Sequence, residues 1–299
     1  MNERNTKLRV AILGSGNIGS DLLSKVMRSD VLECTLFVGR NLASRGIARA
    51  ASMGVTVSDR SIEAIVGSPD VCDLVFDATS ALDHVRHAAM LDGLGKTVID
   101  MTPSNLGTMC VPAVNLLECL EYPNVNMVTC GGQATIPLAH ALGRVHHDIE
   151  YIEVVSQIAS RSAGPATRVN LDEYIETTER GIVRFSGCVR AKAILNLNPA
   201  QPPVDMQATV FARIADPDMA AITAAVQDMV VRVAGYVPGY ELIVPPTLEN
   251  GRVVVMVRVR GRGDYLPSYA GNLDIINCAA VAVAEGHARA AVEKEGDRT

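Results

Sequence analysis

No feature of this chain constrains its fold more than a glycine pattern near its start, Gly14-Ser15-Gly16-Asn17-Ile18-Gly19. A short apolar run at residues 8–13 precedes the pattern, and a helical pattern at residues 21–27 follows it. In such a fingerprint the first glycine makes the turn, the second lets a pyrophosphate approach the backbone, and the third lets the helix pack on the strand. The start of the helix offers free N–H groups to phosphates. Residues 14–19 are therefore predicted to bind a dinucleotide.

The segments after this turn alternate between strand and helix up to residue 100. We expect strands at 34–38, 55–57, 74–77 and 97–100, and helices at 43–53, 62–66 and 83–91. Alternation at this spacing is typical of a parallel sheet with right-handed crossovers. The first part of the chain is therefore predicted to be a Rossmann-type, doubly wound α/β domain.

The pattern changes after residue 130. Strands are expected at 151–160, 192–197 and 253–259, and the last of these partly alternates in a way that suits an antiparallel sheet. Helices are expected at 215–233, opened by a turn at 216–218, and at 272–293, which we expect to pack back on the first domain. Because 299 residues are enough for two separate cores, a second domain of α+β type is predicted.

Composition narrows the functional classes. Hydrophobic residues make up 48% of the chain and charged residues 20%, which is typical of a soluble α/β enzyme. The net charge of -6 argues against nucleic acid or an anionic membrane as a partner. We find no apolar run near the roughly 18 residues of a membrane span, and no signal-type segment after the polar residues 1–7. A cytoplasmic protein is expected.

The seven cysteines are odd in number and form no Cys-x-x-Cys pair, so we expect neither a disulfide framework nor a structural metal site. One of them, Cys130, differs from the rest because Gly131 and Gly132 follow it at the expected start of a helix. The other six lie in or beside apolar or helical segments and are interpreted as small buried residues: Cys34, Cys72, Cys110, Cys119, Cys188 and Cys278.

Cys130 is the candidate nucleophile. A thiol of ordinary pKa is only about 3% thiolate at neutral pH, and a helix N-terminus increases that fraction. We expect the Gly131 and Gly132 amides to reach the sulfur or a developing oxyanion, and Pro137 to lie in the first turn of the helix. A flexible glycine hinge is the alternative interpretation. No histidine of the sequence is an obvious general base, so activation is expected to rest on backbone groups and the cofactor.

The end of the second expected strand lacks the acidic residue that usually binds the ribose of NAD. Gly39, Arg40 and Asn41 stand there instead. Arg40 could pair with a 2′-phosphate, which would make NADP a tolerated or preferred cofactor beside NAD. The alternative is a solvated surface arginine.

A family resemblance rests on segments spread over nearly the whole chain. They are the glycine pattern, Asp77-Ala78-Thr79-Ser80, residues 124–137 around Cys130, Ser162-Ala163-Gly164-Pro165, Tyr265-Leu266-Pro267, and Tyr269-Ala270-Gly271-Asn272-Leu273-Asp274-Ile275. In these segments the chain resembles the acylating acetaldehyde dehydrogenases of aromatic meta-cleavage pathways, enzymes of aromatic hydrocarbon catabolism.

The resemblance implies that a short-chain aldehyde, NAD or NADP, and coenzyme A (CoA) give acyl-CoA through a thioester on Cys130. It implies a fold like that of glyceraldehyde-phosphate and semialdehyde dehydrogenases, with a dinucleotide-binding domain from 1–130 and 271–299 and a catalytic and dimerisation domain from 131–270. It also implies a homodimer or larger oligomer, and an associated 4-hydroxy-2-oxoacid aldolase. The implied cofactor contacts are Ser15, Gly16, Asn17, Ile18, Thr79, Ser162, Ala163, Gly164, Pro165, Ala166, Thr167, Arg168, Val169, Asn170 and Asn272.

The chain departs from the family pattern at Asn41 and Ala208, where the family commonly has an aspartate, and at Ala166, where it has a glycine. The stretch at 243–253 is also shorter than usual. Four alternatives stay open: a larger acyl group; an acyl-phosphate reductase that uses Arg144, Arg161 or Arg168; a non-catalytic dinucleotide-binding partner of an aldolase; and a redox sensor built on Cys130.

Overall fold

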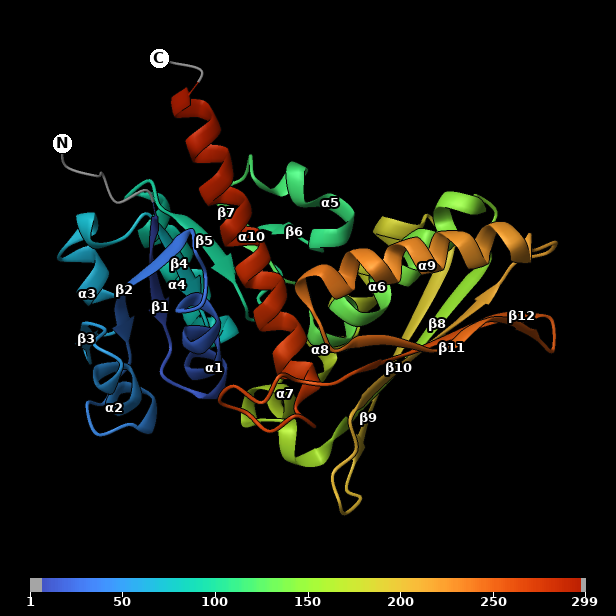
Figure 1. Ribbon diagram of the computed structural model, residues 1–299, viewed down its shortest axis with the longest axis horizontal. Coiled ribbons are helices and arrows are strands. Elements are labelled where there is room, and N and C mark those ends of the chain that lie inside the picture. The colour runs from blue at the N-terminus through green and yellow to red at the C-terminus, as the bar shows by residue number, and fades with distance from the viewer. Residues whose placement is uncertain (1–6, 297–299) are drawn as a thin grey trace. The chain divides into compact units, whose positions relative to one another are not determined.

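The computed structural model describes residues 7–296, so residues 1–6 of the expected polar start and the last three residues lie outside the described part. The chain forms two compact units (Figure 1). The first comprises Met1–Cys110, Asn115–Met127 and Ala280–Thr299, and the second comprises Val111–Val114 and Val128–Ala279. The last helix, α10 (Gly271–Gly296), contributes residues to both units.

The first unit contains a seven-stranded sheet in the order β3-β2-β1-β4-β5-β7-β6. Every pair in it is parallel, which confirms the predicted doubly wound sheet. The order reverses between β1 and β4, and ligands of such sheets bind at the carboxyl ends of the strands beside this switch point. The strands are β1 (Leu8–Leu13), β2 (Leu32–Val38), β3 (Val57–Ser58), β4 (Leu74–Asp77), β5 (Thr97–Asp100), β6 (Thr108–Met109) and β7 (Asn124–Asn126).

The first four α-helices of this unit follow the strands as the sequence predicts, and capping side chains set the start of two of them. Ser44 accepts a hydrogen bond from the Ile47 amide and starts α2 later than expected, and Ser80 accepts one from the Asp83 amide at the start of α4. The helical segments are α1 (Asn17–Val26), α2 (Arg45–Ser52), α3 (Glu63–Val66), the 3₁₀ helix η1 (Pro69–Val71), α4 (Ala81–Asp92) and α5 (Pro112–Cys119), which spans the boundary with the second unit. The sequence analysis did not predict η1 or α5.

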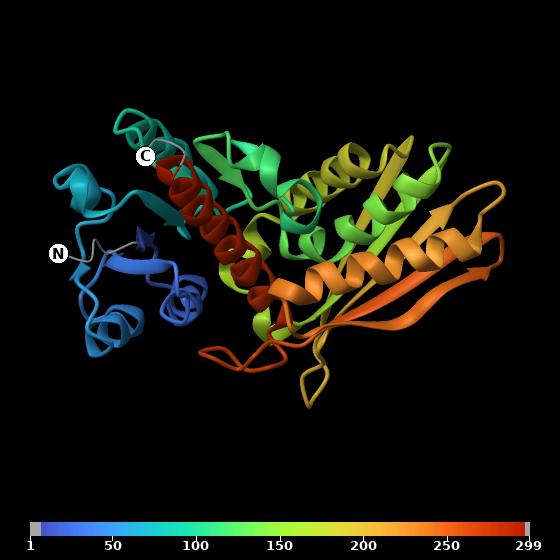
Figure 2. The same ribbon diagram turned by 45° about the horizontal axis from the view of Figure 1, so that its top comes forward.

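The second unit contains a five-stranded sheet in the order β11-β12-β10-β8-β9, in which only the β8–β9 pair is parallel. Burial alternates along β10, so that Met206, Ala208, Val210 and Ala212 face the core. Helices of the unit cover that face, as Figure 2 shows for α9. The strands are β8 (Tyr151–Ala159), β9 (Arg190–Asn198), β10 (Met206–Arg213), β11 (Tyr240–Glu249) and β12 (Arg252–Val259).

The helices of the second unit differ from expectation in several places. The helix expected at 215–233 is α9 (Met219–Tyr236), which begins later because the Asp218 carboxylate accepts hydrogen bonds from two amides and caps it. Pro137 lies inside α6 (Cys130–Val145) rather than in its first turn, because Thr129 caps the helix directly before Cys130. The sequence analysis did not predict α8 (Leu171–Ser186). The unit also has the short helices η2 (Ser160–Ser162) and α7 (Pro165–Val169).

The final helix corrects one expectation about membranes. The segment Gly271–Glu293 of α10, with a mean hydropathy of 1.2, is long and apolar enough to cross a membrane by length and composition. The segment reaches this hydropathy because it contains many alanines and few charged residues. Within the described chain, 56% of the 18-residue window that meets this test is buried inside the protein, and core helices of soluble proteins share these properties.

Candidate active site

The glycine turn between β1 and α1 has the packing that the fingerprint predicts. Gly14 has φ +123°, and a Cβ built on it would lie 2.5 Å from the Ala78 carbonyl oxygen. A Cβ on Gly19 would lie 1.9 Å from the Gly14 carbonyl oxygen, whereas one on Gly16 meets nothing within 4 Å. Gly16 and Asn17 are exposed, and Ser15 and Ile18 are half-buried. The turn is therefore closed on the protein side and open where a pyrophosphate would approach the backbone.

The residues that follow β2 are exposed. Arg40 and Asn41 lie at the carboxyl end of that strand, the edge at which such sheets bind ligands. The Asn41 side chain accepts a hydrogen bond from the Ala43 amide at 2.9 Å, so it stabilises its own turn. A basic side chain, and no carboxylate, directly follows Gly39 here.

A buried carboxylate, Asp77, organises the end of β4. One of its oxygens accepts hydrogen bonds from the Thr79 amide at 3.1 Å and the Thr79 hydroxyl at 2.5 Å. The other lies 2.9 Å from Nδ1 of both His84 and His87. Both histidines are buried on α4, one turn apart. This cluster fixes Thr79, a predicted cofactor contact, directly after the strand.

Opposing effects set the ionisation of this cluster. Burial raises the pKa of Asp77, but hydrogen bonds from His84, His87 and Thr79 outweigh it and hold the pKa well below its ordinary value. Burial lowers the pKa of His84, but the hydrogen bond to Asp77 and the charge of Asp100 raise it overall. The Asp100 carboxylate lies 3.5 Å from Nε2 of His84. The favoured state is an ionised Asp77 beside a protonated His84.

The candidate nucleophile Cys130 is the first residue of α6, as predicted, and is 8% exposed. The Thr129 hydroxyl oxygen accepts a hydrogen bond from the Gly132 amide at 2.8 Å. This amide therefore caps the helix and does not bond to the Cys130 sulfur, which the sequence analysis had named as one of its expected partners. The Gly131 amide donates to the Tyr174 hydroxyl at 2.9 Å, and that hydroxyl lies 3.6 Å from Cys130 Sγ. Burial raises the pKa of Cys130, while Tyr174 and the amides of Gly131 and Cys130 lower it less strongly.

The sheet beneath α6 presents a row of three uncharged side chains. Ala208 pairs with Ser156 on one side and with Val257 on the other, and all three lie on the buried face. A Cβ on Gly131 would lie 2.8 Å from Ser156 Oγ, so this row lies next to the start of α6. The position where the resemblance implies an aspartate therefore carries no proton acceptor.

The structure brings Ser162 and Asn272 together, because the Asn272 side-chain amide donates to the Ser162 carbonyl at 3.4 Å. Among the described residues, the Asn272 Oδ1 atom is buried and has no hydrogen-bond partner. Arg168 bonds to the Ser160 carbonyl and hydroxyl, both at 2.9 Å, and to the Ala163 carbonyl at 3.2 Å. Arg168 therefore stabilises the 160–163 turn through hydrogen bonds from its guanidinium to protein atoms. Gly164, Thr167 and Asn170 are half-buried and Val169 is exposed; Pro165 and Ala166 are known here only as backbone of α7.

Sequence reasoning missed Tyr174, which the structure brings to the nucleophile. The signal for its helix is the spacing of the buried residues Tyr174, Thr177, Thr178, Gly181 and Ile182. Most of these are polar or small, so hydrophobic periodicity does not reveal the buried face.

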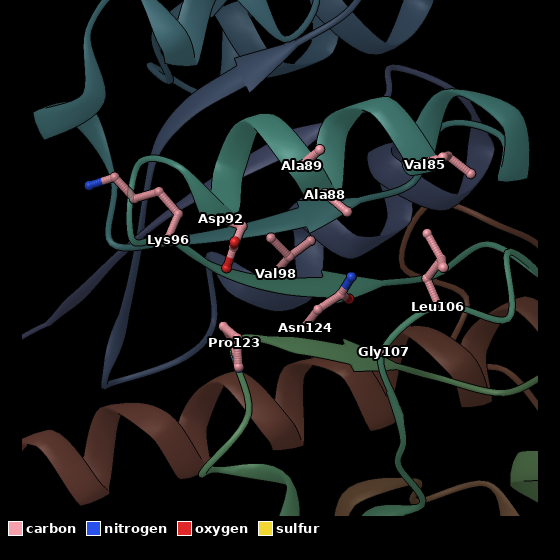
Figure 3. Close-up of a pocket in the computed structure, with 10 residues that line it drawn as sticks. All are labelled: Val85, Ala88, Ala89, Asp92, Lys96, Val98, Leu106, Gly107, Pro123 and Asn124. Atoms are coloured by element: carbon pink, nitrogen blue, oxygen red, sulfur yellow. The ribbon is translucent and has the colours of Figure 1, made fainter.

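A pocket of about 350 Å³ in the first unit holds none of the predicted site residues. Figure 3 shows it between α4 and the chain around Leu106, with Asp92 and Lys96 toward one end. Its lining is mainly apolar, from Val85, Ala88, Ala89 and Val98 among others. The pocket therefore gives no support to another site for the predicted chemistry.

Known structures first define the class of fold. An aspartate semialdehyde dehydrogenase II from Vibrio cholerae, solved in complex with ASA, is similar with a TM-score of 0.65 at 15% identity, over 95% of this chain and 99% of that one. An aspartate semialdehyde dehydrogenase from Candida albicans, solved with NADP, is similar with a TM-score of 0.62 at 11% identity, over 92% and 99%. The chain has the fold of the semialdehyde dehydrogenases, as predicted.

Sequence relatives then define the family. Acetaldehyde dehydrogenases of Pectobacterium atrosepticum and Spirochaeta aurantia are 60% and 56% identical to the chain, over 95% and 96% of its length and 97% of theirs. That of Geobacillus stearothermophilus is 49% identical over 94% of this chain and 96% of its own. Residues 130–267 match the family model described as prokaryotic acetaldehyde dehydrogenase, dimerisation. The chain belongs to the acetaldehyde dehydrogenase family, a family of oxidoreductases that act on aldehydes, as the resemblance implied.

Proposed function

We propose that the chain is a CoA-acylating aldehyde dehydrogenase, which converts a short-chain aldehyde, NAD or NADP, and CoA into acyl-CoA, reduced cofactor and a proton. The observation that carries this proposal is the position of Cys130 at the capped N-terminus of α6, in a chain of this family. A cysteine beside a nicotinamide is the minimal equipment for oxidising an aldehyde through a thioester.

The residues proposed to hold the cofactor fit it in two respects. The open backbone at Gly16 suits a pyrophosphate, since no side chain lies where the phosphates would approach. The unpartnered Oδ1 of Asn272 suits an N–H donor such as a carboxamide. We accordingly assign cofactor binding to Gly14, Ser15, Gly16, Asn17, Ile18, Gly19, Arg40, Thr79, the 162–170 segment and Asn272. The proposed dinucleotide-binding domain is 1–130 with 271–299, and the proposed catalytic and dimerisation domain is 131–270.

The proposed mechanism forms and breaks one bond to Cys130. The thiolate adds to the aldehyde carbon, a C–S bond forms, and the carbonyl π electrons move to oxygen. A bound nicotinamide would supply the acceptor for a hydride from that carbon, and the electrons on oxygen would re-form the carbonyl. Cys130 then holds the acyl group as a thioester. The CoA thiol loses its proton to solvent, its sulfur attacks the acyl carbon, and the C–S bond to Cys130 breaks with its electron pair returning to the cysteine sulfur.

Mass spectrometry of the acyl-enzyme tests this proposal. Mixing the protein with acetaldehyde and NAD or NADP in the absence of CoA is expected to add one acetyl group to the peptide that contains Cys130. Addition of CoA is expected to remove that group as acetyl-CoA. A stable adduct on another residue, or release by phosphate in place of CoA, would contradict the proposal.

Arg40 is proposed to favour NADP. Its exposed guanidinium at the end of β2 can pair with a 2′-phosphate, and an aspartate there would instead accept hydrogen bonds from the ribose hydroxyls. In Arg40→Asp, the ratio of kcat/KM for NADP to that for NAD is expected to fall by about tenfold or more. Arg289→Asp, with the same change of net charge on α10, is expected to leave the ratio unchanged. A strong preference for NAD in both the wild type and Arg40→Asp would exclude this role.

The proposed assembly follows from the family. We propose that the chain forms a homodimer through the region that matches the dimerisation family model, residues 130–267. We further propose a cytoplasmic location, a role in aromatic hydrocarbon catabolism, and association with a 4-hydroxy-2-oxoacid aldolase that supplies the aldehyde. Light scattering of the chain alone and with such an aldolase measures both associations.

A further inference from the structure

A buried tyrosine on α8 contacts the candidate nucleophile. The hydroxyl of Tyr174 lies 3.6 Å from Cys130 Sγ, within the range of hydrogen bonds to sulfur, and the two residues are 7% and 8% exposed. A Cβ added to Gly131 would lie 2.1 Å from this hydroxyl. The absence of a side chain at Gly131 therefore allows the hydroxyl to approach the first turn of α6.

The neighbouring hydrogen bonds limit which atoms can donate around the Tyr174 hydroxyl. The Thr178 hydroxyl donates to the Tyr174 carbonyl at 2.7 Å, so Thr129 must donate in the 2.7 Å contact between the two threonine hydroxyls. An amide can only donate, so the Tyr174 hydroxyl oxygen accepts the Gly131 N–H. The hydroxyl hydrogen of Tyr174 then has two side chains within reach, Cys130 and Thr129, which both hydrogen-bond this hydroxyl. A negatively charged sulfur is the stronger acceptor of the two.

The tyrosine is a donor and not a base. Burial raises the pKa of Tyr174 well above its ordinary value, and the adjacent Cys130 raises it further. Tyr174 is therefore a neutral phenol at neutral pH, and the hydrogen bond that it provides is the largest effect that lowers the pKa of Cys130. Two other titratable groups on or beside α6 are bonded elsewhere: Tyr240 of β11 donates to the Ala134 carbonyl, and His140 Nδ1 bonds the Phe185 carbonyl, both at 2.8 Å.

We propose that Tyr174 is a catalytic residue that donates a hydrogen bond to the Cys130 sulfur whenever that sulfur carries negative charge. This occurs twice in the proposed reaction: before the sulfur attacks the aldehyde, and when the acyl group leaves and the C–S electron pair returns to sulfur. Tyr174 keeps its proton in both steps. The proposal rests on the function proposed for Cys130, and it adds the group that holds the thiolate where no histidine or carboxylate is seen to do so among the described residues of the second unit.

The test is the pH dependence of Cys130 alkylation by iodoacetamide in Tyr174→Phe, followed by mass spectrometry of the Cys130 peptide. Loss of a hydrogen bond to a charged group is expected to raise the thiol pKa by about one unit and to slow alkylation at pH 7 about tenfold. The kcat is expected to fall by a similar factor, while the KM for the cofactor stays unchanged.

The matched control is Tyr240→Phe, which removes a buried hydroxyl bonded to the same helix but not to the sulfur. It is expected to leave the alkylation profile unchanged. Circular dichroism verifies that both variants fold. An alkylation profile of folded Tyr174→Phe that matches the wild type would overturn the proposal.

A second substitution covers the case in which Tyr174→Phe does not fold. Placing 3-fluorotyrosine at position 174 preserves the ring and makes the hydroxyl a stronger donor, so the thiol pKa is expected to fall and alkylation at pH 7 to accelerate. No change, or a change in the other direction, would overturn the proposal. Because alkylation needs no aldehyde, cofactor or CoA, its outcome is independent of the acyl-adduct experiment, which alone tests whether Cys130 carries the acyl group.

Discussion

Cys130→Ser is expected to lower kcat by roughly 10³-fold or more, with little change in cofactor binding. A serine hydroxyl ionises far less readily than a thiol, and the start of α6 is buried. Burial already raises the pKa of the native thiol, so the same environment disfavours an alkoxide even more strongly. Steady-state oxidation of acetaldehyde in the presence of CoA measures the loss, and fluorescence titration with the reduced cofactor measures binding.

The matched control for this prediction is Cys188→Ser in the same unit. Cys188 is also buried, and its Sγ donates to the Arg190 carbonyl, a bond that a serine hydroxyl can replace. Its kcat is expected to stay within about twofold of the wild type. Retention of full activity in Cys130→Ser would show that the chain does not form a thioester on this residue.

Asp77→Asn is expected to destabilise the folded protein by about 3–5 kcal/mol near pH 5.5, the usual cost of removing one partner from a buried ion pair. The Asp77 carboxylate accepts four hydrogen bonds, two from Thr79 and one from each histidine. An asparagine replaces one carboxylate oxygen by an NH₂ group, which cannot accept the hydrogen bonds from Thr79 or from the two histidines. A buried donor then has no acceptor, and a protonated His84 has no counter-ion.

The pH dependence of this loss follows from the two pKa shifts. Asp77, with a lowered pKa, stabilises the fold above its unfolded value of about 3.9 and loses this effect as pH falls through the folded value. His84, with a raised pKa, stabilises the fold below its unfolded value of about 6.5 and loses this effect as pH rises through the folded value. Both contributions are present between about pH 4 and 6.5, so the loss is expected to be smaller at pH 9.

Guanidinium unfolding at pH 5.5 and pH 9, followed by circular dichroism, measures both quantities. Asp73→Asn is the control, because Asp73 also pairs with a cation, Arg9, but both side chains are about two-fifths exposed. Exposed pairs contribute about 1 kcal/mol or less, so this variant is expected to be nearly as stable as the wild type. Equal losses at the two pH values in Asp77→Asn would rule out an ionised cluster.

The parts of the fold that local sequence rules specify were predictable. The β1 strand, the glycine turn and α1 are fixed by an apolar run, by glycines that leave no space for a Cβ, and by a helical pattern within some 20 residues. The sequence predicts the start of a helix at Cys130, directly before two glycines. The structure confirms this start, which the Thr129 cap sets. Each of these features depends on neighbours in sequence.

Other elements were missed because their determinants are not local. The buried face of α8 consists mostly of polar or small residues that fit against α6, as Gly181 does against Ile136. Strand β11 contains Pro245 and Pro246, and prolines argue against a strand unless its position in the sheet is known to be at the edge, as it is here. The contact of Tyr174 with Cys130 joins residues 44 positions apart, and only the packing of the two helices reveals it.

The contrast between Gly14 and Gly19 on one side and Arg40 and Asn41 on the other has a consequence for how this protein can change. The two glycines leave no space even for a methyl group, so the backbone turn that they form cannot be altered at these positions in small steps. The residues after β2 are exposed and free of such crowding. Substitutions at the end of β2 can therefore change the cofactor preference, by natural selection or by design. We expect Gly14 and Gly19 to stay the same while this happens.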